Sequence, residues 1–136
     1  FSALKVAALS GIDVRLLAPS NPDSRIVFHA SRSYYPELLE AGVKIYEYRE
    51  GFMHSKIMIV DGQLASIGTS NMDMRSFHLN FEVNAFLYRT NSVKKLVHDY
   101  LHDLLVSNEL HSETFQNRNF FVRFFESLSR LLSPFL

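Results

Sequence analysis

Four side chains in the middle of the sequence have the types needed for chemistry on a phosphate ester: His54, Lys56, Asn71 and Glu82. An imidazole can attack phosphorus, or it can donate a proton to a leaving oxygen. An ammonium group and an amide can hold the non-bridging oxygens, whose negative charge must be stabilised in the transition state. A carboxylate can accept a hydrogen bond from the far ring nitrogen of the histidine and so fix its tautomer. Together these types favour catalysis on a phosphodiester, provided that the fold brings them close.

Three predicted strands surround these residues. Residues 53–60 and 63–67 predict two strands joined by Asp61-Gly62, a pair typical of a tight β-hairpin. Residues 81–88 alternate between apolar and polar side chains and predict a third strand. If the three strands are neighbours in one sheet, the four functional side chains converge without strain.

The face on which each side chain lies follows from the alternation along a strand. His54 and Lys56 are two residues apart, so both should project from the same face, while the isoleucines that follow point into apolar packing. The same argument places Glu82 and Asn84 together on the third strand. Asn71 lies in the loop after the second strand. This arrangement predicts that Glu82 accepts from the ring of His54.

The rest of the chain predicts an α/β fold in which a mixed sheet is flanked by helices. The predicted elements are a helix around residues 4–8 that stops at Gly11, a strand over 12–18, a helix over 24–40 interrupted at Pro36, a strand over 43–48 after Gly42, a helix from Ser92 to about Val106, and a last helix from about Arg118 to Leu132, before Pro134. A length of 136 residues suits one domain, so residues 1–136 are expected to form a single domain.

Composition narrows the functional classes. The chain is 47% hydrophobic and 21% charged, as is typical of a globular fold. Its 14 basic residues balance 14 acidic ones, so it lacks the basic excess common in nucleic-acid-binding proteins. It has no cysteine for a disulfide or a thiolate metal site, and no apolar run approaches the roughly 20 residues that span a bilayer. Its opening residues, helical in pattern and without an initiator methionine, suggest a piece of a longer protein.

The spacing of the functional residues resembles the HKD signature of the phospholipase D superfamily. The matching positions are His54-x-Lys56-x4-Asp61, then Gly68-Thr69-x-Asn71, with Glu82 after the motif. Thr69 stands where the family more often has serine, and it keeps the hydroxyl. Longer stretches, among them ASRSYYPELLEAGVKIYEYREGFMHSKIMIVD, SNMDMRSFHLNFEVNAFLY and the tail FFESLSRLLSPFL, are similar to the C-terminal half of the bacterial cardiolipin synthases.

The resemblance implies a phospholipase D-like half-domain that acts on lipids. In this family two halves, each with one HKD motif, face a single active site, so an N-terminal half and transmembrane helices are expected upstream, in a protein of the bacterial cell membrane. The implied reaction transfers a phosphatidyl group between two phosphatidylglycerol molecules by double displacement through a phosphohistidine, giving cardiolipin. Two phosphodiesters are exchanged, so the resemblance implies no metal, ATP or other cofactor. The isolated chain is expected to be inactive.

The resemblance also assigns roles to individual residues. His54 is either the nucleophile or the general acid, and the family's usual assignment of the C-terminal histidine favours the acid. The catalytic set implied is His54, Lys56, Asp61, Asn71 and Glu82, although the position of Asp61 at a tight turn favours a structural role. Substrate contacts are expected from Lys56, Thr69, Asn71, Arg75 and His78.

Alternatives remain open for both the function and the tail. The function could be that of a single-motif phosphodiesterase or nuclease active as a homodimer, or of a non-catalytic membrane-binding module.

His98 and His102 have a metal-compatible spacing but no third ligand, so both are expected to face solvent. The Phe-rich segment 115–130 is expected to form a terminal helix that docks on the core; the alternative is that it presents an apolar face to lipid, with arginines at headgroup level. The main hypothesis expects phospholipids, the other HKD half and the membrane surface as partners, and no nucleic acid.

Overall fold

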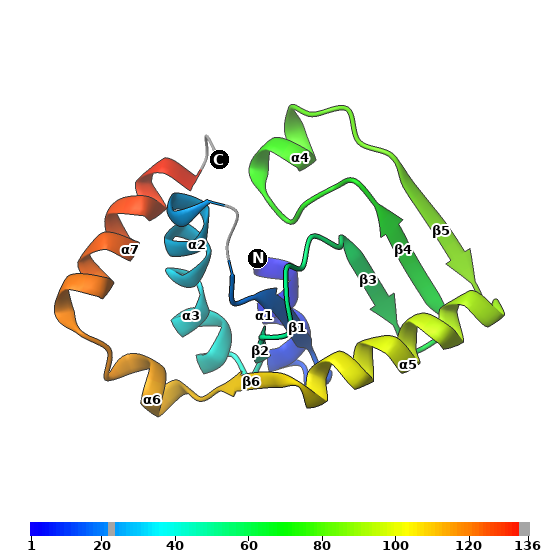
Figure 1. Cartoon of the computed structure of the whole chain (residues 1–136), viewed down its shortest axis with the longest axis horizontal. Helices are drawn as coiled ribbons and strands as arrows, with labels where there is room; N and C mark the ends of the chain where they lie inside the picture. Colours follow the sequence, from blue (N-terminus) through cyan, green and yellow to red (C-terminus); the bar gives the residue numbers. More distant parts are fainter. Residues whose placement is uncertain (22–23, 134–136) are drawn as a thin grey trace.

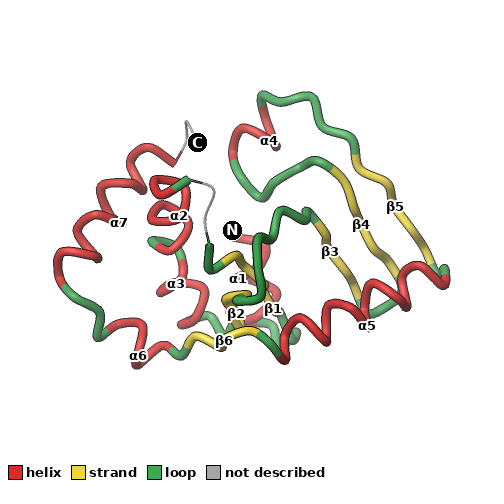
Figure 2. The backbone as a smooth tube through the Cα atoms, viewed as in Figure 1, coloured by secondary structure: helices red, strands yellow, loops and turns green. Residues whose placement is uncertain are grey.

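The computed structural model describes residues 1–21 and 24–133 (Figure 1). Its elements are, in chain order, α1 (Ser2–Leu9), β1 (Arg15–Pro19), α2 (Arg25–Arg32), α3 (Tyr35–Glu40), β2 (Lys44–Tyr48), β3 (Ile57–Val60), β4 (Leu64–Gly68), α4 (Met74–His78), β5 (Asn84–Tyr88), α5 (Asn91–Leu105), β6 (Ser107–Leu110), α6 (Ser112–Gln116) and α7 (Phe120–Leu132). Figure 2 shows that the strands form two separate groups, with helices around them.

The first sheet has the strand order β1-β2-β6. β1 pairs with β2 in parallel and β2 pairs with β6 in the antiparallel sense, so this sheet is mixed. The helices of the chain itself cover it, because Val43 and Ile45 pack with Tyr35 and Leu38 of α3 and with Phe115 of α6. Ile45 is completely buried. The predicted α/β class, with a mixed sheet flanked by helices, is therefore confirmed.

The second sheet is antiparallel, with the order β3-β4-β5. The predicted hairpin is confirmed: Gln63 N donates to Val60 O at 3.0 Å across a turn in which Asp61 has φ 52° and Gly62 has φ 62°. Both angles lie in the left-handed region that tight hairpin turns use. The chain thus builds two small sheets where one was expected, because β2 already has a neighbour on each side and the hairpin pairs elsewhere.

One face of the second sheet is largely uncovered. The strand register places Met58, Val60, Phe86 and Tyr88 on the same face, and their exposed fractions are 45%, 42%, 67% and 60%. We call these four residues the open sheet face. On the other face, Ala65 is completely buried.

The helix α5 connects the two sheets, since it contacts β5 of the second sheet and β2 and β6 of the first. In Figure 1 it runs along the lower edge of the molecule. Its N-cap is Thr90, whose hydroxyl accepts from Val93 N at 3.3 Å, so the predicted cap at Ser92 is wrong by two residues. At the outer edge, α7 packs against α2. In the part of the chain that the structure describes, no helix is both long and apolar enough to cross a membrane.

Two of the predicted strands begin later than expected. β3 begins at Ile57 rather than Met53, and β5 begins at Asn84 rather than Phe81. The strand between them, β4, ends at Gly68, so the residues before β3 and β5 have no strand beside them with which to pair. The functional residues predicted on strand faces therefore lie on the segments that lead into the strands.

The remaining boundaries are close to the prediction. α1 ends before Gly11, which has a φ of 86°, and the helical stretch over 24–40 divides before Pro36 into α2 and α3. β1 begins at Arg15 rather than Ile12, and α7 begins at Phe120. The short elements α4, β6 and α6 were not predicted. The last helix ends at Leu132, as predicted.

Candidate active site

The second sheet brings several predicted site residues to one edge because its strands are antiparallel. The segments that precede β3 and β5 lie beside the segment that follows β4. Two backbone hydrogen bonds join these segments: Gly68 N donates to Lys56 O at 3.2 Å, and Thr69 N donates to Val83 O at 3.0 Å. The fold thus makes neighbours of Lys56, Thr69 and Glu82.

Gly68 allows the close approach of β4 and β5 at this edge. A Cβ atom at this position would lie 1.9 Å from Asn84 Oδ1 and 2.1 Å from Val83 O, far inside van der Waals contact. Because one of these atoms belongs to the backbone, a side chain here would push the start of β5 away from β4. The glycine of the Gly-Thr-x-Asn element therefore lets Thr69 reach Glu82.

Glu82 is the centre of a hydrogen-bond network. One of its carboxylate oxygens accepts from Thr69 Oγ1, and the other accepts from Ser76 Oγ at 2.9 Å and from Asn80 Nδ2 at 3.3 Å. The hydrogen bond from Thr69, followed by that from Ser76, lowers the pKa of Glu82, with smaller contributions from Asn80 and from the charge of Lys56. Glu82 is therefore an anion at neutral pH, and its partners fix its position.

The short helix α4 links this network to the loop that carries Asn71. Asp73 caps the helix by accepting from Ser76 N at 2.7 Å. Ser76 is only 6% exposed, and its hydroxyl accepts from Asn71 N at 3.2 Å while donating to Glu82. Ser76 and Asn80 were not predicted as site residues from the sequence. Asp73, of a residue type preferred at helix N-caps, is the signal that could have located α4.

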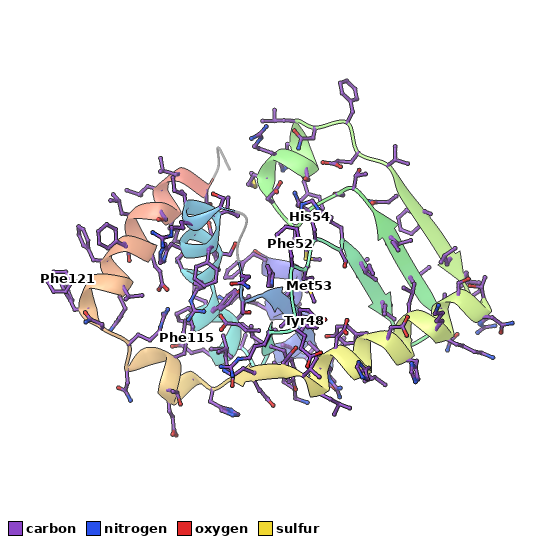
Figure 3. All side chains as sticks on the ribbon, viewed as in Figure 1. Tyr48, Phe52, Met53, His54, Phe115 and Phe121 are labelled. Atoms are coloured by element: carbon purple, nitrogen blue, oxygen red, sulfur yellow. The ribbon has the colours of Figure 1, made fainter. Side chains whose placement is uncertain are left out.

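His54 and Lys56 lie on the segment that leads into β3, and Figure 3 shows His54 close to Phe52 in the middle of the view. The two rings are stacked, with centroids 5.7 Å apart and planes at 13°. Lys56 Nζ donates to His54 O at 2.8 Å. The predicted hydrogen bond from the His54 ring to Glu82 is wrong for this structure, because the carboxylate is held by Thr69 and its other partners instead.

The other predicted residues divide between two places. Arg75 and His78 lie on α4, beside the Asn71 loop, and both are exposed. Asp61 lies in the hairpin turn at the opposite end of β3, about 16 Å from Lys56 at the usual rise of a strand. The structure therefore separates Asp61 from the other site residues.

No metal centre is formed by the residues that the structure describes, since no three histidine, aspartate or glutamate side chains come together there. His98 and His102 on α5 are both exposed, as expected, and the side chain of His98 is 82% exposed. The site thus consists of an imidazole, an ammonium group, an amide and an anionic carboxylate around one edge of the second sheet.

Residues 1–104 match a protein family described as "Cardiolipin synthase, PLD-like domain". The matched stretch includes the whole motif from His54 to Glu82 and both sheets except β6. The chain belongs to this family.

Its likeness to curated members extends beyond the matched residues into the C-terminal helices. The cardiolipin synthase of Alkalihalophilus pseudofirmus is 74% identical over 135 residues, which are 99% of this chain and 27% of the relative. Those of a Geobacillus species and of Halalkalibacterium halodurans are 72% and 70% identical, with the same coverage. The chain spans about a quarter of the length of these curated cardiolipin synthases.

Two solved structures show the same fold at low sequence identity. Nuc from Salmonella typhimurium, a phospholipase D family member, has a TM-score of 0.69 at 17% identity, covering 82% of this chain and 72% of its own. Phosphatidylserine synthase from Haemophilus influenzae has a TM-score of 0.70 at 14% identity, covering 99% of this chain and 38% of its own. The cardiolipin synthase family member described here thus shares the fold of the phospholipase D family.

Proposed function

We propose that this chain is a phospholipase D-like half-domain, residues 1–136, that supplies one of the two HKD motifs of a cardiolipin synthase. The longer protein would be a phosphatidyltransferase of the bacterial cell membrane that makes cardiolipin from two phosphatidylglycerol molecules. The observation that carries the proposal is the identity of 70–74% to curated cardiolipin synthases over 99% of the chain. The grouping of Lys56, Thr69 and Glu82 at one sheet edge supports it.

The reaction proceeds in two displacements. One active-site histidine attacks the phosphorus of a phosphatidylglycerol; a P–N bond forms, the P–O bond to the headgroup glycerol breaks, and the other histidine donates a proton to the departing oxygen. A hydroxyl of a second phosphatidylglycerol then loses its proton to that histidine and attacks the phosphohistidine. The P–N bond breaks and cardiolipin leaves. His54 takes one of these two roles, and the proposal favours the general acid.

The remaining residues stabilise charge and hold positions. The ammonium of Lys56 has three N–H donors, so its hydrogen bond to His54 O leaves capacity for a phosphate oxygen. Asn71 supplies an amide to the same oxygens, and the negative charge that builds on them in the transition state is stabilised. Glu82 contributes as a fixed anion that attracts Lys56 and orders the loop through Ser76. Thr69, Arg75 and His78 are the proposed further substrate contacts, whereas Asp61 stabilises the hairpin turn.

The second HKD half is the proposed partner of the second sheet. His54 and the open sheet face belong to the same part of the chain, and both are exposed. A second half placed there would supply the other histidine and cover apolar side chains that are now in contact with water. The curated relatives, of which this chain spans 27%, are long enough to contain it.

The test is substitution of His54 in the longer protein, with cardiolipin formation measured from labelled phosphatidylglycerol. His54→Ala should lower the rate about a thousandfold or more, because it removes the group that transfers the proton or carries the phosphatidyl group. His98→Ala is the matched control: it removes an exposed histidine on α5 and should leave the rate unchanged. Undiminished synthesis by His54→Ala would contradict the proposal.

One alternative has a specific observation in its favour. Nuc has the same fold, and the part that matches this chain makes up 72% of Nuc. A protein with this fold can therefore be little longer than one such unit. The alternative is a single-motif phosphodiesterase or nuclease that completes its site by forming a homodimer. Sizing of the purified chain, combined with plasmid-cleavage and cardiolipin-synthesis assays, separates the two. A dimer that cleaves plasmid favours the alternative, whereas an inactive monomer agrees with the main proposal.

A further inference from the structure

The helix α7 packs against the protein through its charged side. Glu126 is 3% exposed and pairs with Arg32 of α2 at 3.5 Å and with Arg118. Arg130 Nη2 lies 2.8 Å from Glu37 Oε1 of α3. Surface helices usually turn an apolar stripe toward the core and a charged face toward water. α7 does the reverse.

The opposite side of α7 is apolar and exposed. At about 100° per residue, seven side chains fall within an arc of about 140°, and Glu126 and Arg130 lie outside it. We call these residues the α7 arc: Phe120, Phe121, Phe124, Phe125, Leu128, Leu131 and Leu132. Their exposed fractions range from 47% to 73%. With roughly half of about 200 Å² exposed on each, the α7 arc presents on the order of 700 Å², more than the apolar patches usual on a monomer. Figure 3 shows Phe121 at the outer margin, pointing away from the protein.

We infer that the α7 arc inserts into the headgroup region of a lipid bilayer and anchors this half of the protein to the membrane surface. The charges of the helix fit an anionic surface, because its acidic residue, Glu126, is buried in ion pairs while Arg123 is exposed. An apolar face bordered by arginine is the pattern of helices that lie in the interface. With 13 residues, α7 is about 20 Å long, too short for the roughly 30 Å hydrocarbon core, so it lies along the surface.

The position of α7 in the fold indicates that lipid, rather than the rest of the protein, covers the α7 arc. In Figure 1, α7 and the β3-β4-β5 sheet lie at opposite sides of the molecule. A second HKD half must complete the site at the sheet, so it would cover the open sheet face and leave the α7 arc uncovered. This step rests on the proposed function, which also requires the enzyme to take both substrates from a bilayer.

The experiment compares the two apolar faces by fluorescence. Because the chain has no cysteine, Phe121→Cys and Phe86→Cys can each carry a single environment-sensitive label. The pair is matched, since Phe121 is 69% exposed and Phe86 is 67% exposed. On addition of phosphatidylcholine vesicles with a minority of phosphatidylglycerol, the label at 121 should shift to the blue and be quenched by lipid-borne quenchers. The label at 86 should change little.

A second measurement uses vesicle affinity. The double variant Phe121→Ser/Phe125→Ser should bind these vesicles about a hundredfold more weakly, since each phenylalanine contributes about tenfold. Phe86→Ser should change the affinity less than about twofold, and circular dichroism checks that all variants remain folded. Equal shifts at both labels, no shift at either, or self-association of the chain through the α7 arc would overturn the inference. Vesicle binding needs no turnover, so His54→Ala should bind as the unaltered chain does, and a failure of the proposed reaction remains distinguishable from a failure here.

Discussion

The β1-β2-β6 sheet packs Val43 and Ile45 against α3 and α6, whereas the β3-β4-β5 sheet leaves Phe86 and Tyr88 more than half exposed. Both sheets have three strands, and the more exposed second sheet is the more apolar in sequence, so hydrophobicity alone does not explain the difference. The helices are distributed unequally: α1, α3 and α6 contribute to the core of the first sheet, and α5 is the helix that reaches the second. The candidate site residues lie on the segments at one edge of the second sheet. The part of the chain that carries the candidate site is therefore the part whose sheet keeps an uncovered face.

The same contrast holds for how each region is stabilised. The first region is closed by apolar packing and by a partly buried chain of ion pairs from Glu47 through Arg32 to Glu126. The second is held at its functional edge by hydrogen bonds that radiate from the exposed network around Glu82. Substitutions in the first region should therefore act mainly on stability, and substitutions at the site edge should act mainly on geometry and ionisation.

The largest expected effect on stability comes from Glu126→Ala. Removal of this carboxylate leaves Arg32 and Arg118 buried without their shared partner, and burial already lowers the pKa of Arg118. The loss should be about 4 kcal/mol in the free energy of unfolding, measured by urea denaturation. Glu113→Ala on α6 is the control, since Glu113 is exposed and its loss should change stability by less than about 0.5 kcal/mol. Equal effects of the two substitutions would mean that α7 is held by something other than its ion pairs.

A pair of isoleucines tests the contrast between the sheets more directly. Ile45 of β2 is completely buried, and Ile67 of β4 is 37% exposed. Ile45→Ala should lower the free energy of unfolding by about 3 kcal/mol, and Ile67→Ala by less than about 1 kcal/mol, because water already reaches part of its side chain. If the second HKD half covers the open sheet face, the cost of Val60→Ala, a substitution on that face, should grow in the longer protein. The costs of Ile45→Ala and of Ile67→Ala, which lies on the opposite face of the second sheet, should stay the same. An equal cost in the isolated chain would contradict the view that the second sheet is unfinished.

The elements that local chemistry specifies were predictable from the sequence. Asp61-Gly62 defines the hairpin because few residues adopt the positive φ angles of that turn. Pro36 predicts where α2 and α3 divide, and the apolar periodicity from Val93 to Leu104 predicts α5. These features depend on neighbours in the chain, so no tertiary information was needed.

The features that depend on distant partners were not predictable. The alternation of side chains continues before β3 and β5, but pairing stops where β4 ends at Gly68. β6 has the sequence Ser-Asn-Glu-Leu, which carries no hydrophobic strand signal, and α4 is too short to show a period. Glu126, on a helix rich in phenylalanine, would ordinarily be placed toward solvent, and only the positions of Arg32 and Arg118 explain its burial.

In the candidate site, too, the features set by residue type were predictable and those set by distant partners were not. The residue types His, Lys, Asn and Glu and their spacing predict chemistry on a phosphodiester, which stays a prediction, and the structure groups Lys56, Thr69 and Glu82 as neighbours. The partner of Glu82 was predicted wrongly, because parity along an ideal strand was applied to residues that precede the strand. Ser76 contributes through a helix that starts after Asp73, so its role depends on a tertiary contact rather than on the motif.

The smallest expected effect concerns the ionisation of Glu82, and it tests whether the site edge is organised by hydrogen bonds. Thr69→Val removes the hydroxyl whose hydrogen bond is the largest cause of the lowered pKa of Glu82, so that pKa should rise toward its ordinary 4.5. A lowered pKa means that the folded state favours the carboxylate more than the unfolded chain does. The stabilisation is therefore complete above pH 4.5 and is lost as the pH falls through the lower folded-state pKa.

Thr69→Val should thus weaken this acid-dependent stabilisation, because the folded and unfolded pKa values of Glu82 become more alike. The measurement is an NMR titration of the carboxyl carbon of Glu82. Thr69→Ser keeps the hydroxyl and should keep the lowered pKa, which makes it the matched control. The hydrogen bond from Val83 N to the Thr69 hydroxyl is also lost in the valine variant, so the amide protons of Thr69 and Val83 should exchange faster with solvent. A pKa that does not move would show that Ser76 and Asn80 hold Glu82 without help from Thr69.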